Sequence, residues 1–253
     1  MLPQEDIDRL RGLRVDYTRY VSEFESKRAS GEEKFDWRSH VVECKSLAVA
    51  TWLLDGDLSK TRSIFACAGE AVVQLIRSWV EAGTPYWSKE VAMGMECALI
   101  SGNMVLAKTA AELLENPEAY VGGRSVVGLY ARGLRNMIVG DHPSAREDLG
   151  SIAQTRKQPY QQLGKLYIAL LDRDDRVVEK ELKAHIQWFT KNAKPEEKSY
   201  WFEGKTITHR LIPFEFYLSV PGLAFCNMAC RHGMSVGVDD EPFLPRELYQ
   251  CTT

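Results

Sequence analysis

The chain has 253 residues, of which 45% are hydrophobic and 26% are charged, a composition typical of a globular protein that can bury a large core. This composition excludes disorder over most of the chain. Thirty-two Lys and Arg against 35 Asp and Glu give a formal net charge of −3, so the overall balance does not favour a nucleic-acid partner, which selects a basic surface.

The predicted secondary structure is helical throughout. Apolar residues recur with helical spacing almost everywhere, and no convincing stretch shows the period of two that marks a half-buried strand. The sequence therefore predicts an all-α protein with a single domain over residues 1–253, in which residues 1–35 form a looser N-terminal helix. In chain order the predicted helices span residues 5–28, 36–55, 59–82, 87–101, 104–115, 124–139, 143–155, 160–172, 175–191, 196–203 and 214–232.

Four junctions between these helices look alike. Each has an apolar helix end, then Gly with Asp or Asn, or Asp-Arg-Asp in the last case, and then a second helix. The glycines can adopt the left-handed conformation that ends a helix, and the polar residue can cap the next one. These pairs are Gly56 and Asp57, Gly102 and Asn103, and Gly140 and Asp141, with Asp174 at the fourth junction. The pattern predicts an irregular stack of antiparallel helical hairpins, similar to a tetratricopeptide solenoid.

The sequence also predicts the compartment. The N-terminal MLPQEDIDRLRGLR carries charges every few residues, which argues against a signal peptide, and no later segment offers about 20 uninterrupted apolar residues for a membrane span. The six cysteines are scattered, as reduced and mostly buried thiols would be. We therefore expect a cytoplasmic protein with no membrane partner.

Catalytic and metal-binding motifs are not recognisable. Nucleophile elbows, phosphate loops and dinucleotide fingerprints are missing from the sequence. The pair Gly122-Gly123 fits a flexible turn between helices better than an anion-binding helix start. Cys226, Cys230 and His232 come closest to a ligand cluster, but buried thiols on an apolar helix explain them better. The sequence therefore predicts no catalytic residue, no metal and no cofactor.

The C-terminal stretch IPFEFYLSVPGLAFCNMACRHGMSVGVDDEPFLPRELYQ resembles the end of the immunity protein 49 family of bacterial polymorphic toxin systems. A Leu- and Ala-rich helix closes at a basic-Gly turn, here Arg231-His232-Gly233, and leads through an acidic connection to a Pro-x-Leu-Pro-like tail, here residues 242–245. The junction ALLDRDD is also similar. The resemblance implies an all-helical inhibitor that is not an enzyme, is encoded beside a toxin, and protects its producer and kin. We expect it to form a one-to-one complex with that toxin.

The tail also has a physical interpretation of its own. Its prolines and the alternation of Val236 and Val238 predict an extended strap over the last helices at residues 234–245. That role is structural, with Asp239, Asp240 and Glu241 as its exposed part.

Candidate toxin-binding residues come from two further patterns. Loops of successive hairpins should emerge along one edge, which predicts an acidic row of Asp55, Asp57, Asp141, Asp172, Asp174 and Asp175. One carboxylate per helix start suffices for capping, so the carboxylates of Asp55, Asp172 and Asp175 are surplus to capping. They either attract a basic toxin surface or are ordinary turn residues. Tyr200 and Trp201, in an aromatic run among charges, are either a recognition anchor or core residues.

Two other functions compete with toxin inhibition. A tetratricopeptide-like adaptor or effector chaperone would grip a peptide segment in its groove. An enzyme would instead show a well-formed pocket with several titratable side chains of shifted pKa.

Overall fold

The computed structural model describes residues 4–31, 35–84, 86–114, 120–121, 125–192, 196–202, 205–211, 217–234, 236 and 241–249. Helices dominate these residues, and the all-α class predicted from hydrophobic periodicity is confirmed. The helices are α1 (Gln4–Ala29), α2 (Trp37–Asp55), α3 (Leu58–Ala82), α4 (Ser88–Ile100), α5 (Met104–Glu112), α6 (Val126–Val139), α7 (His142–Ala153), α8 (Tyr160–Asp172), α9 (Asp175–Asn192) and α10 (Val220–Arg231).

A β-hairpin replaces the helix predicted at residues 196–203. β3 (Glu196–Phe202) pairs antiparallel with β4 (Lys205–Leu211), and Tyr200 lies opposite Ile207. β3 contains three aromatic residues and β4 contains three β-branched residues, both kinds favour extended backbone, and this preference prevailed over a helical period read from too few residues. A two-residue parallel pairing also joins β1 (Tyr86–Trp87) to β2 (Tyr120–Val121).

The four predicted helix junctions are confirmed. Gly56, Gly102 and Gly140 have φ angles of 62°, 83° and 82°, in the left-handed region. The fourth junction uses Arg173 with φ of 54°, a conformation that costs a non-glycine residue about 1 kcal/mol. At each junction a side-chain oxygen accepts a hydrogen bond of 2.9 to 3.2 Å from the backbone N–H three residues later, the acceptors being Asp57, Asn103, Asp141 and Asp174.

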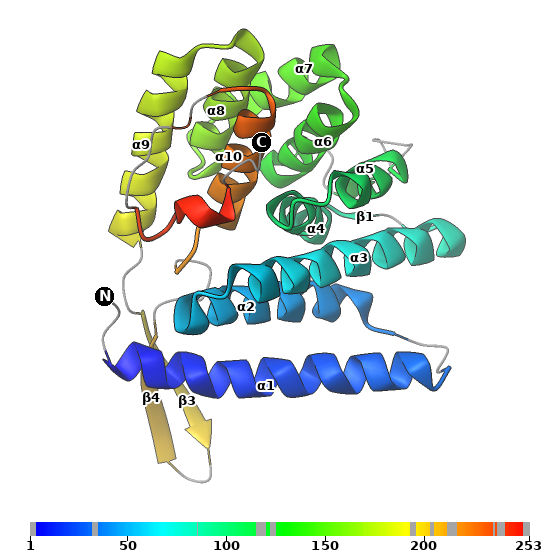
Figure 1. Ribbon diagram of the computed structural model, residues 1–253, viewed down its shortest axis with the longest axis vertical. Helices are drawn as coiled ribbons and strands as arrows, with labels where there is room; N and C mark the ends of the chain where they lie inside the picture. Colours follow the sequence, from blue (N-terminus) through cyan, green and yellow to red (C-terminus); the bar gives the residue numbers. More distant parts are fainter. Residues whose placement is uncertain are drawn as a thin grey trace.

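The helices pack largely in chain order. α1 lies on α2, α2 on α3, and α3 on α4 and α5, and the series continues from α6 to α9 (Figure 1). α10 departs from this order because its main helix contacts are with α4 and α8. Of its residues from Val220 to Ala229, all but Pro221 are buried. The last helix is therefore part of the buried core.

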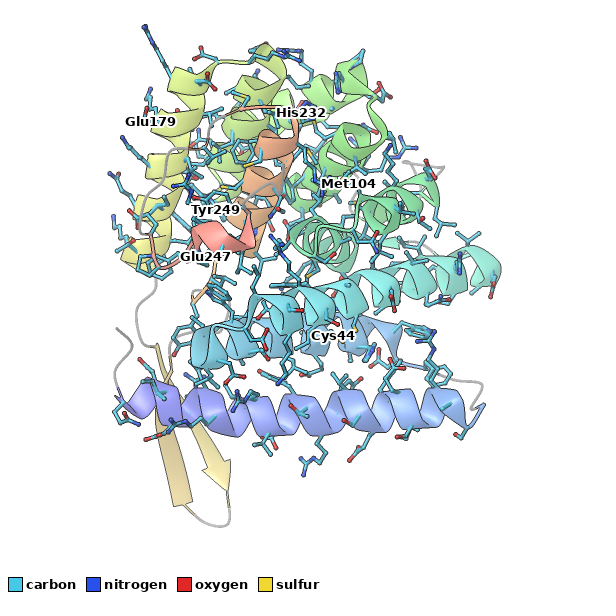
Figure 2. All side chains as sticks on the ribbon, viewed as in Figure 1. Cys44, Met104, Glu179, His232, Glu247 and Tyr249 are labelled. Carbon is cyan, nitrogen blue, oxygen red and sulfur yellow. The ribbon has the colours of Figure 1, made fainter. Side chains whose placement is uncertain are left out.

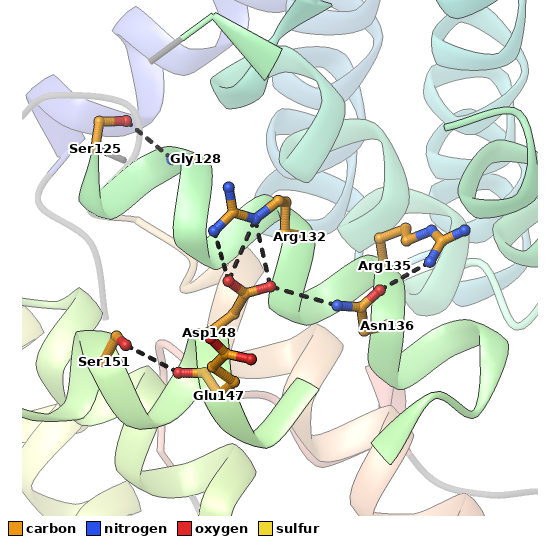
Figure 3. A network of polar contacts seen from close by, with 8 residues as sticks. All are labelled: Ser125, Gly128, Arg132, Arg135, Asn136, Glu147, Asp148 and Ser151. Carbon is orange, nitrogen blue, oxygen red and sulfur yellow. Dashed lines mark hydrogen bonds and ion pairs between the residues drawn. The ribbon is translucent and has the colours of Figure 1, made fainter. Parts of the chain in front are cut away.

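A polar network connects α6 and α7 (Figure 3). Nη2 of Arg132 lies 2.6 Å from Oδ1 of Asp148, and Nδ2 of Asn136 donates to Oδ2 of Asp148 at 3.3 Å. Asp148 is only 9% exposed. Removing the two charges from water costs most of the free energy that their attraction provides. The network therefore mainly sets the relative position of the two helices.

One helix among the described residues, α3, is long and apolar enough to cross a membrane by length and composition alone. Its apolar face packs against α2, α4 and α5. Phe65, Ala68, Val72 and Ile76 of this face are buried, which gives the apolar composition a packing role in the core.

The C-terminal segment folds back onto the helices. Figure 2 shows Glu247 and Tyr249 at the 3-10 helix η3 (Arg246–Leu248), where the carbonyl of Glu247 accepts a 3.2 Å hydrogen bond from Arg62 of α3. Leu244 and Leu248 are fully buried, and residues 242–243 form a turn that is followed by a bend at residue 244. Residues 235 and 237–240 lie outside the described part of the chain, so the extended strap over 234–245 stays a prediction there.

Candidate functional site

A cavity of about 240 Å³ opens between α2, α4, α6, α8, α9 and the start of α10, and we call it the central pocket. Its walls are mostly apolar and include Met93, Leu163 and Leu218, with the aromatic rings of Tyr160 and Trp188. This volume lies just below the range of about 300–1,000 Å³ that is usual for small-molecule sites. The central pocket is therefore sized for one or two amino-acid side chains.

Four helices begin at the central pocket. Lys89 of α4, Val127 of α6, Tyr160 of α8 and Pro221 of α10 all line it, and each lies in the first turn of its helix. A helix N-terminus carries roughly half a positive elementary charge. The backbone therefore adds positive potential to the pocket.

The central pocket also holds a buried carboxyl group. Glu96 is 5% exposed, and its Oε1 accepts a hydrogen bond of 2.8 Å from the hydroxyl of Tyr130. Burial raises the pKa of Glu96 to about 7, although this hydrogen bond and the positive charge of Lys45 oppose the rise. Burial and the neighbouring Glu96 carboxylate also hold the pKa of Tyr130 well above its usual value. The carboxyl therefore titrates near neutral pH, well above the usual range for a glutamate.

Shifted pKa values in a pocket are expected of an enzyme. The residues that line the pocket distinguish a catalytic site from a binding site. The described lining consists of apolar and aromatic residues with Lys45, Lys89 and Glu96, and it includes no Ser, Thr, Cys or His. This part of the pocket therefore holds no Ser, Thr or Cys nucleophile paired with a histidine base. Apolar walls with a few oriented polar groups are suited to holding an anchoring side chain.

A second buried polar pair lies between α9 and α10. Nε2 of His185 is 2.7 Å from Oγ of Ser219, and that oxygen accepts a 3.2 Å hydrogen bond from the backbone N–H of Gly222. Burial lowers the pKa of His185 to about 4. Both residues are buried and Ser219 caps α10, so this pair serves to fasten the two helices.

Ion pairs and caps account for most of the predicted acidic row. Oδ1 of Asp55 is 2.6 Å from Arg14, and Oδ1 of Asp172 is 2.6 Å from Arg146. Thus two of the three carboxylates considered surplus have arginine partners. Asp57, Asp141 and Asp174 cap helices, and Asp175 begins α9.

The structure divides this row between two places. α7 and the end of α8 meet at the Arg146–Asp172 ion pair, and the rings of His142 and His232 are 6.2 Å apart. The α2–α3 turn with Asp55 and Asp57 lies at the left, near α1 (Figure 1). The ion pair thus links α7, which begins after Asp141, to the end of α8 at Asp172, close in sequence to Asp174 and Asp175, whereas Asp55 and Asp57 lie at a separate turn.

A capping carboxylate and a surplus carboxylate should differ in their effect on stability. We expect Asp57→Ala to lower the free energy of unfolding by about 1 kcal/mol, because it removes the 2.9 Å acceptor of the Lys60 N–H. Asp175→Ala is the matched control and should cost only a few tenths of a kcal/mol, since it removes a favourable charge near a helix start. Urea denaturation measures both, and equal losses would contradict this division of roles.

The remaining predicted site residues are placed less completely. Tyr200 and Trp201 lie on β3, but their side chains are outside the described part of the structure, as are Asp239, Asp240 and the pair Gly122-Gly123. The carbonyl of Glu241 accepts a 2.9 Å hydrogen bond from Leu244. Cys226 is buried and Cys230 half-buried, and burial raises the pKa of the Cys226 thiol, which disfavours the thiolate that a metal requires.

Sequence reasoning missed the central pocket. One signal was present, because Glu96 interrupts the apolar run AMGMECALI in the middle of a helix. A carboxyl at such a position is either exposed by a bend in the helix or buried with hydrogen-bonding partners. Because buried carboxyls cluster at functional sites, Glu96 was a candidate site residue. Lys45, Tyr130 and Trp188 carried no comparable signal.

Comparison with known proteins gives one result. A family model described as Immunity protein 49 matches residues 98–248, which is more than half of the chain. Neither a curated protein nor a solved structure matches.

Proposed function

This chain belongs to the immunity protein 49 family, and from that membership we propose that it binds a cognate protein toxin and blocks its activity. The family match over residues 98–248 is the observation that carries the proposal. In this proposal the protein acts in the cytoplasm, forms a one-to-one complex, and protects the producing cell and its kin without catalysing a reaction.

The site chemistry supports inhibition by binding. The central pocket offers apolar walls and few polar groups, and its buried carboxyl is already bonded to Tyr130. A pocket of this kind can receive an anchoring side chain, and such anchors contribute most of the binding energy in many protein interfaces.

The alternative role as a peptide-gripping adaptor receives less support. α10 packs on α4 and α8, with Leu223, Ala224 and Phe225 fully buried. A peptide that entered between those helices would have to displace this buried helix. Binding at the surface of a folded toxin requires no such rearrangement.

The proposal is tested with the toxin encoded beside the gene of this protein. We expect cells that produce the toxin to grow only when the chain is co-expressed, and the purified proteins to co-elute as a one-to-one complex that persists on dilution to micromolar concentration. Light scattering after size exclusion gives the stoichiometry, and an unrelated helical protein serves as the control. Growth arrest despite soluble expression, with no complex formed, would refute the function.

A further inference from the structure

We propose that the central pocket receives an acidic anchor of the toxin, namely an Asp or Glu side chain with an apolar neighbour. This inference rests on the proposed function and deepens it by identifying the chemistry of the contact. Shape and charge complementarity carry it.

The shape of the central pocket favours an apolar neighbour beside the charge. Met93, Leu163 and Leu218 form a wall against which a buried aliphatic or aromatic group can pack, and Trp188 adds a large flat surface. A cavity of about 240 Å³ leaves room for one or two side chains. Clefts of this kind are where interface anchors gain most from losing contact with water.

The charges of the central pocket favour an anion. Among the described lining residues, Lys45 and Lys89 are the basic groups, and Glu96, which accepts the hydrogen bond from Tyr130, is the carboxyl group. The starts of four helices add positive potential. Ser125 and Ser219 cap α6 and α10, whereas α8 begins at Pro159 with no side-chain cap. An incoming carboxylate could therefore accept hydrogen bonds at the start of α8 as well as from Lys89.

Glu96 makes the binding of an anion depend on pH. The ionisable groups around it are Lys45 of α2, Lys89 and Cys97 of α4, Tyr130 of α6, and Tyr160 and Tyr167 of α8, while α9 and α10 contribute uncharged lining. A second carboxylate close to Glu96 raises the pKa of Glu96 further. The complex should therefore take up a proton, and its affinity should increase as the pH falls from about 8 to about 6.

The charged residues of the central pocket lie outside the part of the chain that matches the family. Lys45, Lys89 and Glu96 all precede residue 98, where the family match begins. Membership of the family therefore does not by itself determine the charge of this pocket. The proposal concerns how this chain in particular selects its toxin.

The experiment compares variants of the full chain in calorimetric titrations with the toxin encoded beside its gene. Lys89→Glu reverses a charge at the pocket, and Lys108→Glu makes the same change at an exposed site on α5. We expect Lys89→Glu to weaken binding about tenfold or more and Lys108→Glu to change it less than about twofold. Met93→Trp, which fills the cavity, should weaken binding at least as much as Lys89→Glu. Circular dichroism confirms that each variant is folded.

The pH dependence supplies the second arm. Wild-type affinity should increase as the pH is lowered from about 8 to about 6, and Glu96→Gln should remove most of that increase. An affinity that instead increases with pH in a Glu96-dependent way would identify a basic anchor and overturn the proposal. Unchanged binding by folded Lys89→Glu and Met93→Trp would also overturn it while leaving toxin inhibition intact. A wild-type chain that fails to bind the toxin at all would refute the proposed function itself.

Discussion

Replacing Gly94 by Ala is expected to lower the free energy of unfolding by about 3 kcal/mol, which for a chain of this size corresponds to roughly 10 °C in melting temperature. Gly94 lies on α4 where this helix meets α3. A Cβ atom added there would be 2.2 Å from Cβ of Val72 and 2.4 and 2.6 Å from its two methyl carbons. Val72 is fully buried and branched at Cβ, so its side chain cannot rotate away. The two helices would have to separate, which would open the core.

Gly150→Ala is the matched control for this substitution. Gly150 lies within α7, and an added Cβ meets nothing within 4 Å. There the same change should increase stability by about 0.5–1 kcal/mol, because alanine restricts the unfolded chain and favours a helix. Thermal and urea unfolding of both variants measure the two effects. A Gly94→Ala protein as stable as Gly150→Ala would show that α3 and α4 do not approach each other as closely as the structure indicates.

Stability between about pH 4 and pH 7 is expected to contain two opposite contributions, one from Glu96 and one from His185. The folded-state pKa of Glu96 is raised from 4.5 to about 7, so its contribution is fully present below pH 4.5 and is lost as the pH rises through 7. The folded-state pKa of His185 is lowered from 6.5 to about 4, so its contribution is present above pH 6.5 and is lost as the pH falls through 4. Each shift corresponds to about 3 kcal/mol, and the two largely cancel in the wild-type protein.

Single substitutions separate these contributions. Other carboxyl groups titrate in the same range, so each variant is compared with the wild type at each pH by urea unfolding. Relative to the wild type, Glu96→Gln should gain about 3 kcal/mol as the pH rises from 4.5 to 7. His185→Gln should lose a similar amount, relative to the wild type, as the pH rises from 4 to 6.5. A constant difference across the range for either variant would mean that its side chain is not buried in the folded protein.

Local signals in the sequence carried most of the helix prediction. The glycines and capping residues at the four junctions act within a few residues of the chain, so their effect on the backbone is the same wherever the hairpin is placed. The hairpin of β3 and β4 was not predicted, because it depends on pairing between residues that are farther apart in the chain. Its pairing joins residues such as Glu196 and Leu211, and that partnership leaves no mark in a short window of sequence.

The candidate site was much less predictable. The acidic row was inferred from turns in a regular stack, and the structure places the α2–α3 turn away from the other turns that carry aspartates. Asp55 and Asp172 have arginine partners that are 41 and 26 residues away in the chain. Sequence spacing cannot identify such partners, because ion pairs between helices depend on how the helices are oriented.

The sequence by itself determined the helical class and the positions of the helix junctions and their caps. It also determined the resemblance of the C-terminal region to the immunity protein 49 family. Each of these properties depends on residues that are close together in the chain. Only the tertiary structure decided that α10 returns to α4 and α8 and that Lys45, Glu96, Tyr130 and Trp188 share one pocket. These residues come from four different helices and meet because apolar helix faces must be buried together. Burial in that packed interior is also what raises the pKa of Glu96, a property that no single helix could have shown.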